Sequence, residues 1–173
     1  MRDCDLMVHP VPGFPPGVGT GLWMLADTRR RTLDAVEGLT DGDVGRVPVG
    51  LDNSIGSLLY HLAAIEADWL YADILQIAFP AWMDECFPLD VREEDGRLTP
   101  VPGQTVADLL DRLITVRRHL LEDLAALTDA DYRTERGAES GVTTPEWVLH
   151  HLRQHEAEHR GQIQSIRTAL GNE

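Results

Sequence analysis

The stretch from Thr143 to Leu170 has the sequence TTPEWVLHHLRQHEAEHRGQIQSIRTAL and predicts a long amphipathic helix. Thr143 or Thr144 can cap its start, and Pro145 suits the first helical position. Gly171 follows the last periodic residue, where we expect a left-handed cap. The buried stripe has spacings of three and four residues and consists of Val148, Leu152, His155, His159, Ile163, Ile166 and Leu170. Two histidines therefore occupy positions where the pattern demands apolar side chains.

His155 and His159 are four residues apart, so a helix places them on one face, about 5–6 Å apart at Cβ. This separation lets two imidazoles share one metal ion. The alternative is a pair of core histidines, but each would then need a buried partner for its ring nitrogens. We therefore favour a metal site.

The segment from His155 to His159, HEAEH, also matches the H-E-x-x-H motif of zinc metalloproteases. Such a protease needs a third ligand downstream and a sheet that aligns a peptide, whereas the chain ends soon after His159 and shows no strand-period run of useful length. We therefore do not expect a protease. Glu156 is a candidate catalytic base or a partner of a ligand ring, and the alternative is a solvated glutamate.

Composition limits the other possibilities. The chain has 173 residues and 43% hydrophobic residues, which suits one well-packed domain. A formal net charge of −14 argues against nucleic acid and anionic membranes as partners. The two cysteines, Cys4 and Cys86, form no disulfide framework, and no run approaches the roughly 20 apolar residues of a membrane span. We expect a cytoplasmic protein with free thiols that acts on a small molecule.

Four helical segments are predicted, at about 21–38, 54–78, 105–127 and 145–170. Residues 1–19 are rich in proline and predict an extended arm, so that residues 20–173 form the single domain. Residues 79–103 contain four prolines and form a long connection. We expect the apolar residues of this connection, such as Trp82 and Phe87, to fold back onto the helices. The polar stretch after Leu127 predicts a loop. The fold class is therefore all-α, a four-helix bundle, and the long crossover between the second and third helices permits an up-down-down-up topology.

A third ligand must come from another helix. His61 follows Leu58 and precedes Ile65 on the buried side of the second helix, and it is the other histidine near a core stripe in mid-bundle. We expect Glu66 to be solvated, with a role beside a ligand ring as the alternative. His9, His119 and His150 look peripheral, and His151 could extend the row toward the bundle edge. Three protein ligands with an open position are typical of a catalytic metal, and imidazole suits Zn²⁺ first, with Ni²⁺ or Fe²⁺ as alternatives.

Two segments resemble the DinB-like superfamily of small bacterial four-helix proteins: Ser54–Ala63, with the sequence SIGSLLYHLA, and Leu149–Ile163, with the sequence LHHLRQHEAEHRGQI. The resemblance in order and helix pattern covers residues 20–170. It implies an up-down-down-up bundle, often homodimeric. It also implies a divalent metal bound by one histidine of the second helix and an HxxxH-type pair of the fourth, which are His61, His155 and His159 here.

The activity implied by the resemblance is less specific. Relatives include transferases and isomerases that use low-molecular-weight thiols, so our first hypothesis is a metal-dependent, thiol-dependent S-transferase. The second is a metal-dependent hydrolase with Glu156 as base. The third is a non-enzymatic metal-binding stress protein, in which residues 82–89 would contact partners. Fold alone does not decide among them.

Overall fold

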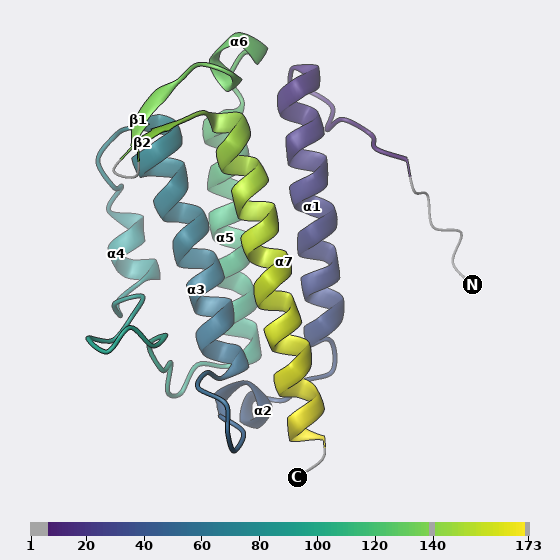
Figure 1. Cartoon of the computed structure of the whole chain (residues 1–173), viewed down its shortest axis with the longest axis vertical. Helices are drawn as coiled ribbons and strands as arrows, with labels where there is room; N and C mark the ends of the chain where they lie inside the picture. Colours follow the sequence, from purple (N-terminus) through teal and green to yellow (C-terminus); the bar gives the residue numbers. More distant parts are fainter. Residues whose placement is uncertain (1–6, 139–140, 172–173) are drawn as a thin grey trace.

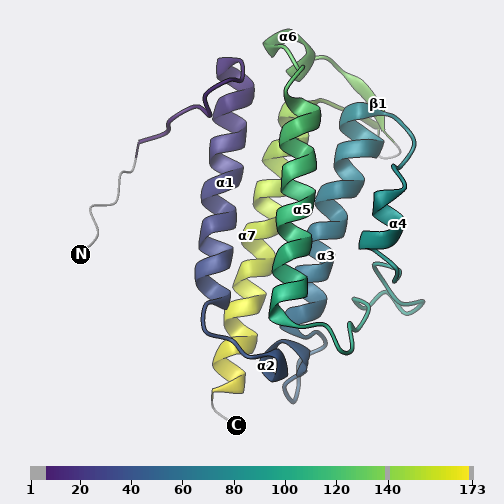
Figure 2. The ribbon, with the colours of Figure 1, turned by 180° about the vertical axis from the view of Figure 1, so that it is seen from behind.

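The computed structural model describes residues 7–138 and 141–171 and is predominantly helical. In this part of the chain four long helices lie side by side (Figure 1): α1 (Pro16–Val36), α3 (Ile55–Asp68), α5 (Val106–Leu124) and α7 (Pro145–Leu170). In that view α1 and α7 run downward and α3 and α5 run upward; Figure 2 shows α5 from the opposite side. The all-α prediction is confirmed.

Local hydrogen bonds explain where the helices begin. Ser54 caps α3 by accepting from the amide of Ser57, and Thr144 caps α7 by accepting from the amide of Trp147 at 3.1 Å. Thr105 and Asp108 form the capping box of α5. The expected left-handed cap at Gly171 is wrong. Its φ is −75°, because its amide still donates to the carbonyl of Arg167, at 3.2 Å, as in a continuing helix.

The N-terminal arm is shorter than predicted. Helix α1 begins at Pro16, so residues 16–19 are helical, consistent with the tolerance of the first helical turn for proline. The arm contacts this turn through a hydrogen bond from the Val11 amide to the Gly19 carbonyl at 3.0 Å. A Cβ on Gly19 would lie 2.9 Å from the Val11 carbonyl oxygen, so glycine allows the close approach. The part of the arm that contains Cys4 lies outside the described residues.

The second predicted helix changes character before it ends. After α3 the chain continues as the π-helix η1 (Trp69–Leu75) and stops at Gln76, whose φ of 55° is left-handed. The Gln76 side chain donates to the carbonyl of Gly137. The helix therefore ends three residues earlier than predicted, where the residue that follows it, Gln76, is tied to another part of the chain.

The long connection between α3 and α5 packs on the helices, as predicted. Trp82, Met83 and Phe87 contact the core, and Trp82 and Met83 belong to a short helix, α4 (Trp82–Cys86), that was not predicted. Tyr60 fastens the connection: its hydroxyl donates to the Leu89 carbonyl at 2.7 Å and accepts from the Leu89 amide at 3.0 Å. Cys86 is a free thiol.

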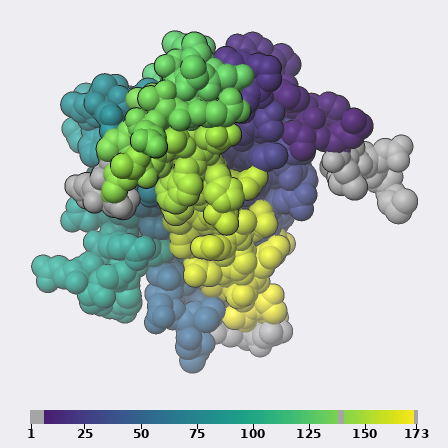
Figure 3. All heavy atoms as spheres, turned by 45° about the horizontal axis from the view of Figure 1, so that its top comes forward, coloured from purple at the N-terminus to yellow at the C-terminus, as the bar shows by residue number. Residues whose placement is uncertain are grey.

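The two other connections also contain short elements. Helix α2 (Asp41–Gly45) lies between α1 and α3, and helix α6 (Asp129–Tyr132) follows α5. The polar stretch after α6 was predicted as a loop but forms a small antiparallel hairpin, β1 (Arg136–Ala138) with β2 (Gly141–Thr143), in which Arg136 pairs with Thr143. Figure 3 shows this green segment lying across the upper end of the molecule.

The core consists of two apolar clusters separated by a polar layer. The lower cluster includes Ile55, Leu113 and Ile163, and the upper cluster includes Leu25, Leu120 and Leu152. Between them along the helices lie four buried or largely buried charged residues, Arg29, Glu66, Arg117 and Glu156. Within residues 7–138 and 141–171, none of the helices combines the length and apolarity that a membrane span requires.

Candidate metal centre

Three histidines from two packed helices meet in the polar layer. His61 lies on α3 and is 1% exposed, while His155 and His159 lie one turn apart on α7 and are half-buried. His61 follows Leu58 by three residues, so the side of α3 that packs on the core also carries the imidazole. The three residues selected from the sequence are therefore brought together.

The ring nitrogens converge on one point. Nε2 of His155 is 3.1 Å from Nε2 of His61 and 3.0 Å from Nε2 of His159. One ligand nitrogen from each ring lies within 4.8 Å of the other two. Ligand nitrogens about 2.0 Å from a tetrahedral zinc ion are about 3.3 Å apart, so the observed spacing fits a shared metal.

Gln162 determines which nitrogen His159 presents. Nδ1 of His159 is 2.8 Å from Oε1 of Gln162, and because a carbonyl oxygen only accepts, Nδ1 carries the ring proton. The Nε2 lone pair of His159 is then free for a cation. Sequence reasoning missed Gln162 as a site residue, although its position three residues after a ligand on the same helix was the available signal.

The two more buried rings are held in the neutral form that a metal requires. Burial, and then the positive charges of His159 and His155, lower the pKa of His61 to about 3. Burial, followed by His159 and His151, lowers the pKa of His155 to about 4. Arg92, in the connection after α4, adds a smaller lowering effect on the pKa of both rings. Sequence reasoning did not identify this nearby positive charge, because the connection is remote from α7 in the chain.

The donor set fits a divalent metal. Imidazole nitrogens suit Zn²⁺, Ni²⁺ and Fe²⁺, and three of them leave a coordination position for a small ligand. Nε2 of His155 faces two other imidazole nitrogens at hydrogen-bond distance, and a cation would accept lone pairs from all three in place of those contacts. Nδ1 of His61 is buried and has no hydrogen-bond partner among the described residues. Of the ring nitrogens in the three histidines, it is the one that is both buried and without a partner in this part of the chain.

The sequence model of the DinB superfamily matches residues 24–163. The chain belongs to the DinB superfamily. The expected family resemblance is thus confirmed, and both histidine-bearing segments fall within the match. No curated protein matches the sequence.

A solved structure supports the fold of this DinB-superfamily chain. The crystal structure of the conserved protein of locus from Enterococcus faecalis superposes with a TM-score of 0.68 at 17% sequence identity. The match covers 88% of this chain and 96% of that one. At this identity the similarity concerns the fold and does not transfer an activity.

Glu156, the candidate base, lies in the buried charged layer. Its Oε1 is 2.8 Å from Nε of Arg29, and its Oε2 is 3.7 Å from Nη2 of Arg117. Glu66 was expected to be solvated, and this is wrong: it is 3% exposed and is bound by Arg29 at 2.7 Å and Arg117 at 2.6 Å. Burial alone would raise the pKa of Glu66, but Arg117 and Arg29 lower it overall. The carboxylate is buried because two guanidinium groups neutralise it.

Three of the remaining histidines lie away from the ligand cluster, whereas the ring of His151 borders it, with its centroid 5.9 Å from that of His155. His151 stacks on Trp147, with ring centroids 5.1 Å apart, and lies one turn from His155. His150 is exposed beside Arg153, and His119 stacks on Trp82 at 4.2 Å. His9 is exposed. The placements of His9, His119 and His150 agree with their predicted peripheral positions, and His151 extends the row of rings on α7, as the sequence allowed.

Proposed function

We propose that this DinB-superfamily protein binds one divalent metal ion through His61, His155 and His159. We further propose that the site activates a low-molecular-weight thiol for an S-transfer reaction with a small electrophile. The convergence of the three Nε2 atoms is the observation that carries the proposal. Zn²⁺ is the metal we propose first, with Ni²⁺ and Fe²⁺ as alternatives.

The chain's own residues account for binding and orientation. The three imidazoles would hold the metal, and Gln162 would keep the proton of His159 on Nδ1. When bound, the metal supplies a positive charge that lowers the pKa of a coordinated thiol or water. Burial keeps His61 and His155 neutral, so they remain available as ligands at neutral pH.

A hollow next to the site offers room for a substrate; Gln162 borders it, and none of the three histidines is among its lining residues. It has a volume of about 430 Å³ and lies between the start of α3 and the second half of α7. Leu58, Gln162 and Ile166 contribute to its lining, so the glutamine that orients His159 also borders this space. Gly161 lines the hollow too, and no atom lies within 4 Å of the Cβ position there. This size agrees with a small-molecule substrate.

The alternatives rest on different observations. A hydrolase with Glu156 as base gains no support from the ion pair that holds this carboxylate against Arg29. A non-enzymatic metal-binding protein would have the same three ligands but no exchangeable coordination position. Water exchange at a Co²⁺-loaded site, measured by relaxation of solvent protons, separates this third possibility from both enzymes.

Three further proposals concern the topology, the oligomeric state and the cellular location. The opposite directions of the α1/α7 and α3/α5 pairs support an up-down-down-up four-helix bundle (Figure 1). Family resemblance supports a homodimer. The free thiol of Cys86 and the acidic composition support a cytoplasmic protein that binds neither nucleic acid nor membranes.

The test is an activity screen with metal-loaded protein. The protein, free metal and the His61→Ala variant are each incubated with a panel of bacterial thiols and a chromogenic electrophile, and thioether formation is followed. Turnover by the wild type that exceeds free metal and is lost in the variant supports the proposal. Turnover no faster than free metal with every thiol would overturn the transferase proposal.

A further inference from the structure

One side of the helix assembly is incompletely packed. Helix α1 packs mainly on α7, and α5 packs mainly on α3. The backbones of α1 and α5 approach each other only sparsely, although these helices are adjacent at the back of the molecule (Figure 2). A groove therefore remains between them.

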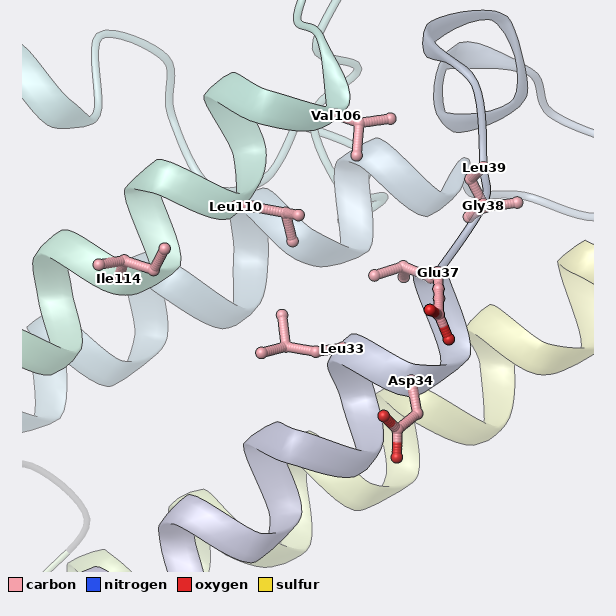
Figure 4. Close-up of a pocket in the computed structure, with 9 residues that line it drawn as sticks. Leu33, Asp34, Glu37, Gly38, Leu39, Val106, Leu110 and Ile114 are labelled. Carbon is pink, nitrogen blue, oxygen red and sulfur yellow. The ribbon is translucent and has the colours of Figure 1, made fainter.

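Two hollows follow this groove and meet at its middle. The lower one has a volume of about 680 Å³, and the upper one about 370 Å³. Leu33 of α1 and Ile114 of α5 line both hollows. In Figure 4, Leu33 projects from one wall of the lower hollow and Leu110 and Ile114 project from the other. The groove is thus continuous along most of α5 and the last turns of α1.

The groove exposes large apolar side chains. Ile114 is 60% exposed and Leu33 is 37% exposed. Exposed apolar side chains are common singly, but a contiguous set in a groove marks an interaction surface. Along α5 the lining runs from Val106 to Glu122, or roughly 25 Å at about 1.5 Å per residue. With about 10 Å of width for each helix, this face measures roughly 500 Å², so two copies would bury roughly 1,000 Å² in total, which is near the lower limit for a specific interface.

The charges along the groove are polarised. The lower hollow is lined by Asp34 and Glu37 and by no basic residue. The upper hollow is lined by three arginines and one glutamate. Arg29 and Arg117 among these are paired with buried glutamates, whereas Arg118 lies at the exposed rim, beside Glu122.

This polarity is self-complementary under a two-fold rotation. Glu37 is one helical turn beyond Leu33, and Arg118 is one turn beyond Ile114, toward the opposite end of the groove. A two-fold axis through the level of Leu33 and Ile114 would bring Glu37 of one copy to the level of Arg118 of the other. A two-fold interface uses the same patch on both subunits, so this arrangement favours a second copy over an unrelated partner.

We infer that the α1–α5 groove is the homodimer interface, with Leu33 and Ile114 near its two-fold axis and Glu37 at the level of Arg118 of the second copy. This inference rests on the proposed homodimer and is independent of the proposed metal chemistry.

The test is the association state of the full chain, measured by sedimentation equilibrium over a range of concentrations. We expect the wild type to be a dimer and Ile114→Glu to weaken dimerisation by at least a hundredfold, because it places a carboxylate among apolar side chains at the centre of the interface, where burial of a charge is costly. Val142 is 71% exposed on the hairpin, so Val142→Glu is the matched control and should remain dimeric. Circular dichroism and metal content should be unchanged in both variants, because neither residue lies in the core or the metal site.

Charge reversal tests the orientation. Glu37→Arg and Arg118→Glu should each weaken the dimer, and the double variant should restore most of the lost affinity. A wild type that stays monomeric would overturn both the homodimer and this interface. A dimer that Ile114→Glu leaves intact would overturn this interface alone, and neither result would bear on the metal site.

Discussion

Arg29 and Glu156 form a buried ion pair that joins α1 to α7, with Nε of the arginine 2.8 Å from Oε1 of the glutamate. Arg29 also binds Glu66 on α3, which in turn binds Arg117 on α5. Each of the four long helices contributes one charge, and the two positive and two negative charges balance. Removal of one member would leave a buried charge without compensation.

Glu156→Gln therefore tests whether this residue stabilises the fold or acts in catalysis. We expect the free energy of unfolding to fall by about 3–5 kcal/mol, because Arg29 loses part of its compensation in the core. Metal content should stay at that of the wild type. Urea unfolding and metal analysis measure the two quantities.

Glu158→Gln is the control, because Glu158 is exposed two residues away on the same helix. Its unfolding free energy should change by no more than about 0.5 kcal/mol. If Glu156→Gln kept wild-type stability but lost a detected activity, the structural interpretation would be wrong and the catalytic one supported.

His61→Ala tests the contribution of α3 to the metal site. We expect protein purified without chelators or a histidine tag to carry about one metal ion per chain, and the variant to lose most of it, because two ligands from one helix leave the site incomplete. His151→Ala, which changes a neighbouring histidine outside the cluster, should keep its metal. Full metal occupancy in His61→Ala would require a different third ligand.

Gln162→Leu tests the orientation of His159. Loss of the acceptor for Nδ1–H should reduce metal affinity by about 10- to 100-fold, the usual effect of removing a group that orients a ligand. Competition with a metal-binding dye measures this affinity. Gln164→Leu alters an exposed glutamine on the same helix and should have no effect. Equal affinities in the two variants would show that Gln162 does not orient the ligand.

Stability without metal should depend on pH through the buried rings. Burial is the main cause that lowers the pKa of His61 to about 3 and that of His155 to about 4, whereas an unfolded imidazole titrates near about 6.5. Well above about pH 6.5 both imidazole rings are neutral in the folded and in the unfolded chain, so they contribute no pH dependence to the free energy of unfolding. Below it the unfolded chain binds protons that the folded chain does not, so the free energy of unfolding falls as the pH decreases toward about 4.

Urea unfolding of the metal-free protein and of His61→Gln, across this range, measures the effect. The variant should lose stability less steeply, and identical slopes would refute the contribution of His61. The metal-loaded protein should release its ion as the pH falls, since a ligand must be neutral to bind. Metal retained well below about pH 4 would contradict a three-histidine site.

The helices were predictable because their signals are local. Thr144 and Thr105 cap helices where the sequence indicated, and the apolar stripes on α5 and α7 lie in the core. The short helices α2 and α6 were missed although each begins with a local capping box, whereas the end of η1 depends on a contact between remote residues. Gln76 ends η1 while bound to Gly137 of the hairpin, and no local pattern specifies that pairing.

The histidine cluster was predictable for a similar reason. His155 and His159 are joined by helical periodicity, which the sequence states directly. His61 required a family resemblance or a choice among the histidines near a core stripe, and the structure then placed its Nε2 3.1 Å from that of His155. Glu66 was misjudged because its compensating charges, Arg29 and Arg117, come from two other helices.

The sequence by itself determined the helical class, the starts of α3, α5 and α7, and the pairing of His155 with His159, because capping and periodicity act within a few residues. Only the tertiary structure decided that His61 completes the cluster, that two arginines neutralise Glu66 and Glu156, and that a groove remains between α1 and α5. Each of these depends on how separate helices pack, and the burial and electrostatics that result belong to the assembled helices and to no single segment.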